Sequence, residues 1–130
     1  MNENVNEKKN NYNKYSREIA FPPDVAERYK EYCAVTKMKL SEPLRVLVLE
    51  SLPQLHTNDD LSEIIRQTQE RSPKDEYKKL SVRLPQEAVD EINTYCKFFK
   101  INWRRCHFLY FLVEKKLLQL LKDVLQDEDE

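Results

Sequence analysis

The 130-residue sequence contains no glycine at all. Glycine-rich loops that hold phosphate groups, such as those of nucleotide-binding proteins, are therefore excluded by composition. Turns that need a positive φ must use asparagine, aspartate or lysine in its place.

Residues that bind metals or carry nucleophilic catalysis are also few. The three cysteines, Cys33, Cys96 and Cys106, show no CxxC spacing, and the two histidines, His56 and His107, lie far apart. We therefore expect no zinc site, no cofactor and no enzyme activity, since no Ser/His/Asp or paired-carboxylate pattern is present. The cysteines are expected to be small core residues. An odd cysteine count without a signal peptide favours a cytoplasmic protein.

Long apolar runs are absent as well. The longest, from Phe108 to Val113, is too short to span a bilayer and is followed by Glu114. We expect no membrane association and no small-molecule substrate. The net charge is −1 and the pI is about 6.2, so any nucleic-acid binding must depend on a local surface.

The sequence contains an internal repeat. The pair Tyr32-Cys33 recurs as Tyr95-Cys96, 63 positions later. At the same spacing three further identical pairs occur, and apolar residues match apolar residues around them. The identical pairs are Pro22 with Pro85, Lys37 with Lys100, and Leu49 with Leu112. The alternative is a chance likeness between two amphipathic helical hairpins.

Each copy begins with a short alternating segment that ends in proline. In the second copy Leu80, Val82 and Leu84 are predicted to point inward, and Lys79, Ser81 and Arg83 outward. In the first copy Ile19 and Phe21 are predicted to point inward, and Ser16, Glu18 and Ala20 outward. We predict that the segments Ser16–Phe21 and Lys79–Leu84 pair antiparallel within the chain.

Helical periodicity follows each strand. Core stripes predict first helices over residues 23–35 and 86–99, with buried positions that include Val25, Tyr29, Tyr32 and Cys33 in the first copy. Second helices are expected to begin at Lys39 or Ser41 and at Asn102. The apolar runs Leu44–Leu49 and Phe108–Val113 are too continuous for surface helices and predict two helices at the centre of the core.

These patterns divide the chain into five parts. We expect a disordered arm over residues 1–14, a first repeat over 15–52 and a linker over 53–77 that contains a helix from Asp59 to Arg71. A second repeat over 78–122 and an acidic tail over 123–130 complete the chain.

Two segments resemble the ribbon-helix-helix superfamily, also called Arc- or methionine-repressor-like. Ser81-Val82-Arg83-Leu84-Pro85-Gln86-Glu87 is similar to the family's strand and first-helix entry. Lys39-Leu40-Ser41-Glu42-Pro43-Leu44-Arg45 is similar to its second-helix entry. Lys39 departs from the family's first serine there, and Lys37 and Lys100 stand where glycine is usual. The resemblance covers about 75 of the 130 residues.

The resemblance implies a mainly α-helical fold in which two antiparallel strands form a ribbon over a helical core. It also implies that the ribbon enters the major groove of double-stranded DNA and that its outward side chains contact base edges. Those side chains are Lys79, Ser81 and Arg83, with Ser16 and Glu18 on the other strand. Backbone phosphates are expected at the second helices and beside the ribbon, at Ser41, Lys78, Asn102, Arg104 and Arg105.

Two functions follow as expectations. The first is a sequence-specific DNA-binding protein, either a transcriptional repressor or an accessory protein of plasmid or mobile-element transfer, partition or copy control, with possible self-association. The second is a protein-interaction or dimerisation module whose ribbon-helix-helix scaffold has lost DNA binding. Glu18 and the acidic pI favour the second, and the Lys79, Ser81 and Arg83 face favours the first.

Overall fold

The computed structural model describes residues 15–56, 58–72, 74–101 and 104–125, so the predicted arm, Asn102 and the end of the acidic tail lie outside it. Helices make up most of the described chain, together with one two-stranded antiparallel sheet. The elements are β1 (Ser16–Phe21), α2 (Pro23–Thr36), α3 (Ser41–Ser51), the 3-10 helix η1 (Leu52–His56), α4 (Asn58–Glu70), β2 (Lys78–Arg83), α5 (Gln86–Phe98) and α6 (Arg105–Leu125). None of the described helices is long and apolar enough to cross a membrane.

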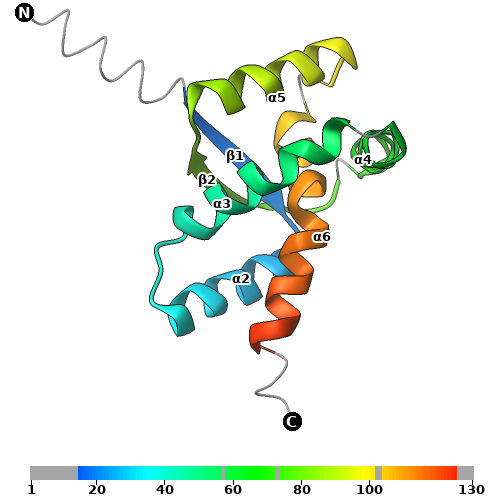
Figure 1. The fold of residues 1–130 in the computed structure, drawn as a ribbon. Coiled ribbons are helices and arrows are strands. Elements are labelled where there is room, and N and C mark those ends of the chain that lie inside the picture. Colours follow the sequence, from blue (N-terminus) through cyan, green and yellow to red (C-terminus); the bar gives the residue numbers. More distant parts are fainter. Residues whose placement is uncertain (1–14, 57, 73, 102–103, 126–130) are drawn as a thin grey trace, which may run out of the picture.

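The two strands pair with each other although about half the length of the chain separates them in sequence (Figure 1). β1 and β2 are antiparallel, and their register places Ser16 opposite Arg83 and Glu18 opposite Ser81. The predicted pairing within one chain is therefore confirmed. Because directly paired residues have side chains on the same face of a sheet, alternate pairs define an inner and an outer face of the ribbon.

The inner face of the ribbon is apolar, as the alternation predicts. Ile19 and Phe21 are fully buried, and Val82 is 1% exposed. Two charged residues also belong to this face: Arg17, which pairs with Val82 and is half-buried, and Lys78, which pairs with Phe21 and is exposed. The prediction that Ala20 points outward agrees with its pairing to Lys79, but its side chain is fully buried.

Each first helix begins after a proline and ends at a lysine in the left-handed region. Lys37 has φ 59° and Lys100 has φ 58°, and they are the positive-φ residues of the described chain. In both turns the next residue donates a backbone hydrogen bond back to a cysteine, with 2.9 Å from Met38 N to Cys33 O and 2.9 Å from Ile101 N to Cys96 O. Lysine thus replaces glycine in a Schellman-type helix end, as the composition requires.

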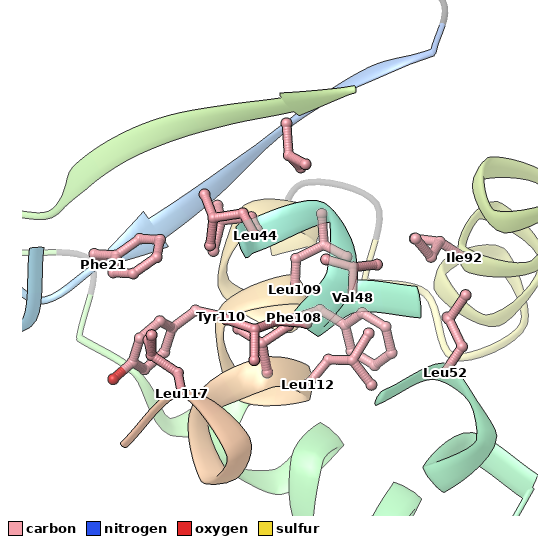
Figure 2. Close-up of a cluster of buried hydrophobic side chains, with 14 of the residues drawn as sticks. Phe21, Leu44, Val48, Leu52, Ile92, Phe108, Leu109, Tyr110, Leu112 and Leu117 are labelled. Atoms are coloured by element: carbon pink, nitrogen blue, oxygen red, sulfur yellow. The ribbon is translucent and has the colours of Figure 1, made fainter. Parts of the chain in front are cut away.

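The core is built around α6, with α3 packed against it beneath the ribbon (Figure 2). Phe108, Leu109 and Leu112 of α6 are fully buried, and so are Leu44 and Val48 of α3. Fully burying a side chain of this kind stabilises a fold by about 1.5–3 kcal/mol. The prediction that the apolar run of α6 is central is therefore confirmed.

The same expectation is only partly correct for α3. Val46 is 50% exposed and Leu49 is 38% exposed, so one face of this helix is open to solvent. The first-helix stripe also differs in one position, because Ala26 is fully buried and Val25 only half-buried. Because an α-helix has 3.6 residues per turn, either of two adjacent residues can lie at the edge of its buried stripe.

The predicted linker helix is present and belongs to the core. Leu61 and Ile64 of α4 are buried in the main cluster, and the helix packs on α6. Thr68 is also fully buried, and its hydroxyl donates to the carbonyl of Ile64 at 2.7 Å. The linker therefore stabilises the fold as well as joining its two halves.

The two halves share one order of elements: a strand, a helix, a left-handed turn and a second helix. The left-handed lysines lie 63 positions apart, which is the spacing of the sequence repeat. Glu18 and Ser81 lie 63 positions apart too, and they are direct partners in the ribbon. In a ribbon with a local twofold axis, a residue at the axis would pair with its own counterpart.

Candidate nucleic-acid interface

The outer face of the ribbon brings together the five residues predicted to contact bases. Lys79, Ser81 and Arg83 are exposed on β2, Glu18 is exposed on β1, and Ser16 is half-buried. Their pairing partners all belong to the same alternation, so these side chains share one face. Hydrogen-bond donors and acceptors are therefore presented together on a narrow two-stranded surface.

The backbone pattern brings these side chains close to one another. Leu84 N donates to Tyr15 O at 2.9 Å just beyond the ribbon, which makes the next pair, Ser16 with Arg83, a non-hydrogen-bonded pair. The pair Glu18 with Ser81 follows in the same alternation. In such pairs the Cα atoms are about 4.5 Å apart and the side chains lie closer than in hydrogen-bonded pairs.

Charge on this surface comes mainly from β2. Lys79 and Arg83 are exposed there on β2, whereas β1 contributes the exposed carboxylate of Glu18. The charged exposed side chains of the outer face are therefore basic on β2 and acidic on β1. One strand attracts phosphate and the other repels it.

Two of the residues predicted to contact phosphate are exposed. Ser41 is the first residue of α3, whose N-terminus has no side-chain cap, and Lys78 is the first residue of β2. Asn102 lies outside the described residues. The expectation of phosphate contact at Ser41 and Lys78 stays a prediction.

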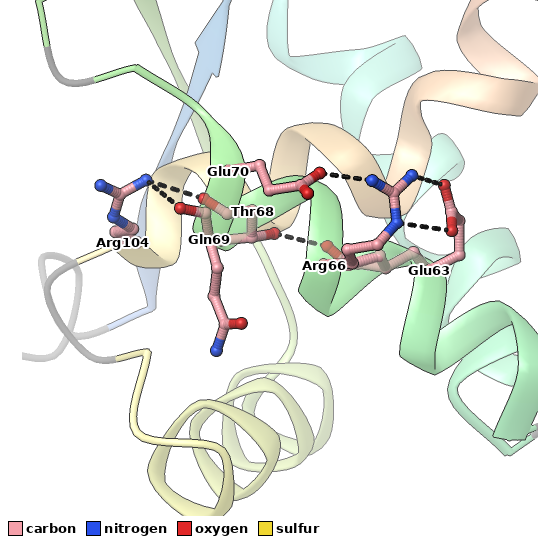
Figure 3. Close-up of polar contacts among 7 residues, drawn as sticks. Glu63, Arg66, Thr68, Gln69, Glu70 and Arg104 are labelled. Atoms are coloured by element: carbon pink, nitrogen blue, oxygen red, sulfur yellow. Dashed lines mark hydrogen bonds and ion pairs between the residues drawn. The ribbon is translucent and has the colours of Figure 1, made fainter.

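Arg104 has a partner inside the chain. Where α4 ends, its Nη1 donates to the carbonyl oxygen of Thr68 at 2.8 Å (Figure 3). It also donates to the carbonyl oxygen of Arg71 at 2.7 Å. The last turn of α4 has no basic residue of its own. The guanidinium thus supplies the positive charge and the donors that a helix C-terminus lacks. Its predicted phosphate contact is a hypothesis that competes with this structural role.

Arg105 also lies against the protein. Its Nη1 is 3.1 Å from Oδ1 of Asn93 on α5, and the side chain is half-buried. Burial, followed by the positive charge of Arg105, lowers the pKa of Arg17 on the inner face of the ribbon. Burial raises the pKa of the nearby Cys96 thiol to about 11, so this cysteine is a protonated core residue.

Arg71 is a structural residue that the sequence analysis missed. Its Nη1 donates to the carbonyl of Ala20 at 2.8 Å, and its guanidinium carbon lies 3.9 Å from the centre of the Tyr77 ring. Nη1 also lies 3.1 Å from Nδ1 of His107, which must accept because an arginine only donates. Burial, together with Arg71 and Arg104, lowers the pKa of His107 to about 4. The group joins the end of α4 to β1.

A hollow of about 300 Å³ lies beside the Ser16–Arg83 end of the ribbon. Its lining residues are Tyr15, Arg45, Arg83, Leu84, Pro85 and Gln86. Arg45 was recognised only as part of the second-helix motif and not as a site residue. Its place one helical turn after Ser41 is the signal that points to it, since residues four apart share a helix face.

The described residues contain no group of three or more histidine, cysteine, aspartate or glutamate side chains that could hold a metal ion. Comparison of the chain with protein-family models, with curated proteins and with solved structures gave no significant match.

Proposed function

We propose that this chain is a sequence-specific double-stranded DNA-binding protein with two ribbon-helix-helix units in tandem. It acts as a transcriptional repressor or as an accessory protein of plasmid or mobile-element transfer, partition or copy control. The observation that carries the proposal is the outer face of the ribbon, where Lys79, Ser81 and Arg83 are exposed over a helical core.

The tandem arrangement is supported by three features with the same spacing. The order of strand and helices recurs, the left-handed turns lie at Lys37 and Lys100, and Glu18 pairs with Ser81. A single strand of this kind has no partner, and a single helical pair has no covered core. Two units in one chain supply both, where the family it resembles uses two chains.

In the proposed complex the ribbon lies in the major groove, which is about 12 Å wide and admits a two-stranded ribbon. Arg83 donates to O6 and N7 of guanine, and Lys79 and Ser81 donate to neighbouring acceptors. Glu18 accepts from N4 of cytosine. Because the two strands carry different residues, the preferred DNA site is not a palindrome.

The test measures sequence preference. We expect Arg83→Ala to reduce the ratio of affinities for a selected and a scrambled duplex by about 10- to 100-fold, because one bidentate arginine–guanine contact contributes about 1–3 kcal/mol of discrimination. Lys30→Ala, which removes an exposed charge from α2, is the control and should leave the ratio unchanged. An Arg83→Ala variant with the wild-type ratio would remove Arg83 from base contact.

A protein-interaction module is the second candidate. The exposed carboxylate of Glu18 lies at the centre of the ribbon, where it opposes DNA phosphates, and Val46 and Leu49 are exposed on α3. A wild-type chain that shows no preference for any DNA sequence would favour this candidate over the first.

A further inference from the structure

The hollow beside the ribbon brings two arginines from different elements together. Arg45 comes from α3 and Arg83 from the last position of β2, and both side chains are exposed. Tyr15 and Gln86 add polar groups to the lining, and none of the described residues that line it carries a carboxylate. Both guanidinium groups attract an anion that enters the hollow.

Two further observations favour an anion here. Within the described part of the chain, Arg45 makes no hydrogen bond or ion pair, so its donors are available. Helix α5 begins at Gln86, and its N-terminus has no side-chain cap. The amides of such a first turn attract anions. Glu87 of the same turn lines a different hollow, with Leu49.

A hollow at the other end of the ribbon has a mainly acidic lining. The repeat spacing relates Arg83 to Ala20 and Arg45 to Phe108, both of which are fully buried. Pro22 and Pro23, the counterparts of Pro85 and Gln86, line a hollow of about 530 Å³ there. Its lining carries one arginine, Arg71, and four carboxylate residues, namely Glu70, Asp75, Glu76 and Glu114. These negative charges repel phosphate.

We infer that the hollow of Arg45 and Arg83 binds a phosphate group and that the related hollow of Pro22 and Pro23 does not. That this phosphate belongs to the DNA backbone rests on the proposed function. Arg45 is its principal ligand, and Arg83 lies between the hollow and the outer face of the ribbon. The chain therefore contacts the DNA backbone unequally at the two ends of its site.

The first experiment uses DNA. We expect Arg45→Ala to weaken binding to selected and scrambled duplexes by the same factor and to reduce the slope of log K against log salt by about 0.9. Arg28→Ala, an exposed arginine on α2, is the matched control and should change neither. Neutral methylphosphonates are introduced one at a time, and on one flank only they should weaken binding of the wild type more than binding of Arg45→Ala. The same effects in both proteins on both flanks, or an unchanged slope, would overturn the inference.

The second experiment separates this inference from the proposed function. Inorganic phosphate is titrated into the full chain without DNA, and the side-chain Nε–Hε signals of Arg45 and Arg83 are followed by NMR. We expect saturable shifts that the Arg28 signal lacks. If the chain binds no duplex but shows these shifts, the proposed function fails and the phosphate site stands. Shifts no larger than those of Arg28 overturn the site, whatever the DNA result.

Discussion

Arg104 is expected to stabilise the fold by completing the C-terminus of α4. Its Nη1 donates to the carbonyls of Thr68 at 2.8 Å and Arg71 at 2.7 Å, and a longer contact reaches Gln69 at 3.4 Å. These groups belong to a helix end with no basic residue in its last turn. Arg104→Ala removes the donors and leaves half-buried carbonyls without them.

The size of the effect follows from the two short bonds. A hydrogen bond to a charged group contributes about 1.5–3 kcal/mol. One nitrogen makes both bonds, so their contributions are not independent, and we expect a loss of about 2–4 kcal/mol in the free energy of unfolding. Arg104→Lys keeps a positive charge but not the planar donors, and should lose about half as much.

Urea unfolding followed by far-UV circular dichroism measures this loss. Arg28→Ala is the control, and as an exposed substitution it should change the free energy of unfolding by less than about 0.5 kcal/mol. An Arg104→Ala variant as stable as the control would refute the capping role. If the folded variant instead had a salt slope of DNA binding lower by about 0.9, the phosphate contact expected from the sequence would apply.

Two other residues give predictions of their own. His107 has a folded pKa of about 4 against 6.5 for the free side chain, so the unfolded chain binds more protons between these values. Stability should therefore fall as the pH is lowered from about 6.5 to about 4, and urea titrations should show a weaker fall in His107→Gln but not in His56→Gln. Lys100→Gly should raise the free energy of unfolding by about 0.5–1 kcal/mol, because relief of the left-handed strain exceeds the entropy cost of glycine. Lys30→Gly, within α2, should lower the free energy of unfolding by about 1 kcal/mol in the same assay. A lower free energy of unfolding in Lys100→Gly would contradict the strain argument.

The sequence predicted those features of the fold that local periodicity encodes. Alternation in Leu80-Ser81-Val82 identified a strand with one buried face, and helical spacing in Leu61 and Ile64 identified α4. The repeat spacing supplied a long-range prediction, the pairing of β1 with β2, because a likeness between two segments links distant positions. The sequence did not predict that α4 packs into the core, because its apolar stripe is the only local signal of that packing.

The candidate site was predicted less completely, because contacts between residues distant in sequence leave no local signal. The outward ribbon residues follow from alternation alone, whereas Arg71 contacts Ala20 across 51 positions and Arg104 contacts Thr68 across 36. The sequence around an arginine does not show whether its side chain lies at a helix end, at the edge of a ribbon or in a groove. Only the fold separates Arg45, which lines an exposed hollow, from Arg104, which contacts carbonyl groups.

The most direct test of sequence-specific DNA binding by the ribbon is selection from a random duplex library with the full chain, followed by titration of the selected and scrambled sites at two salt concentrations. We expect a non-palindromic site and an affinity ratio of at least about 10³, as is typical of specific over non-specific binding. A wild-type chain that binds selected and scrambled duplexes equally, or that selects nothing, would contradict the account.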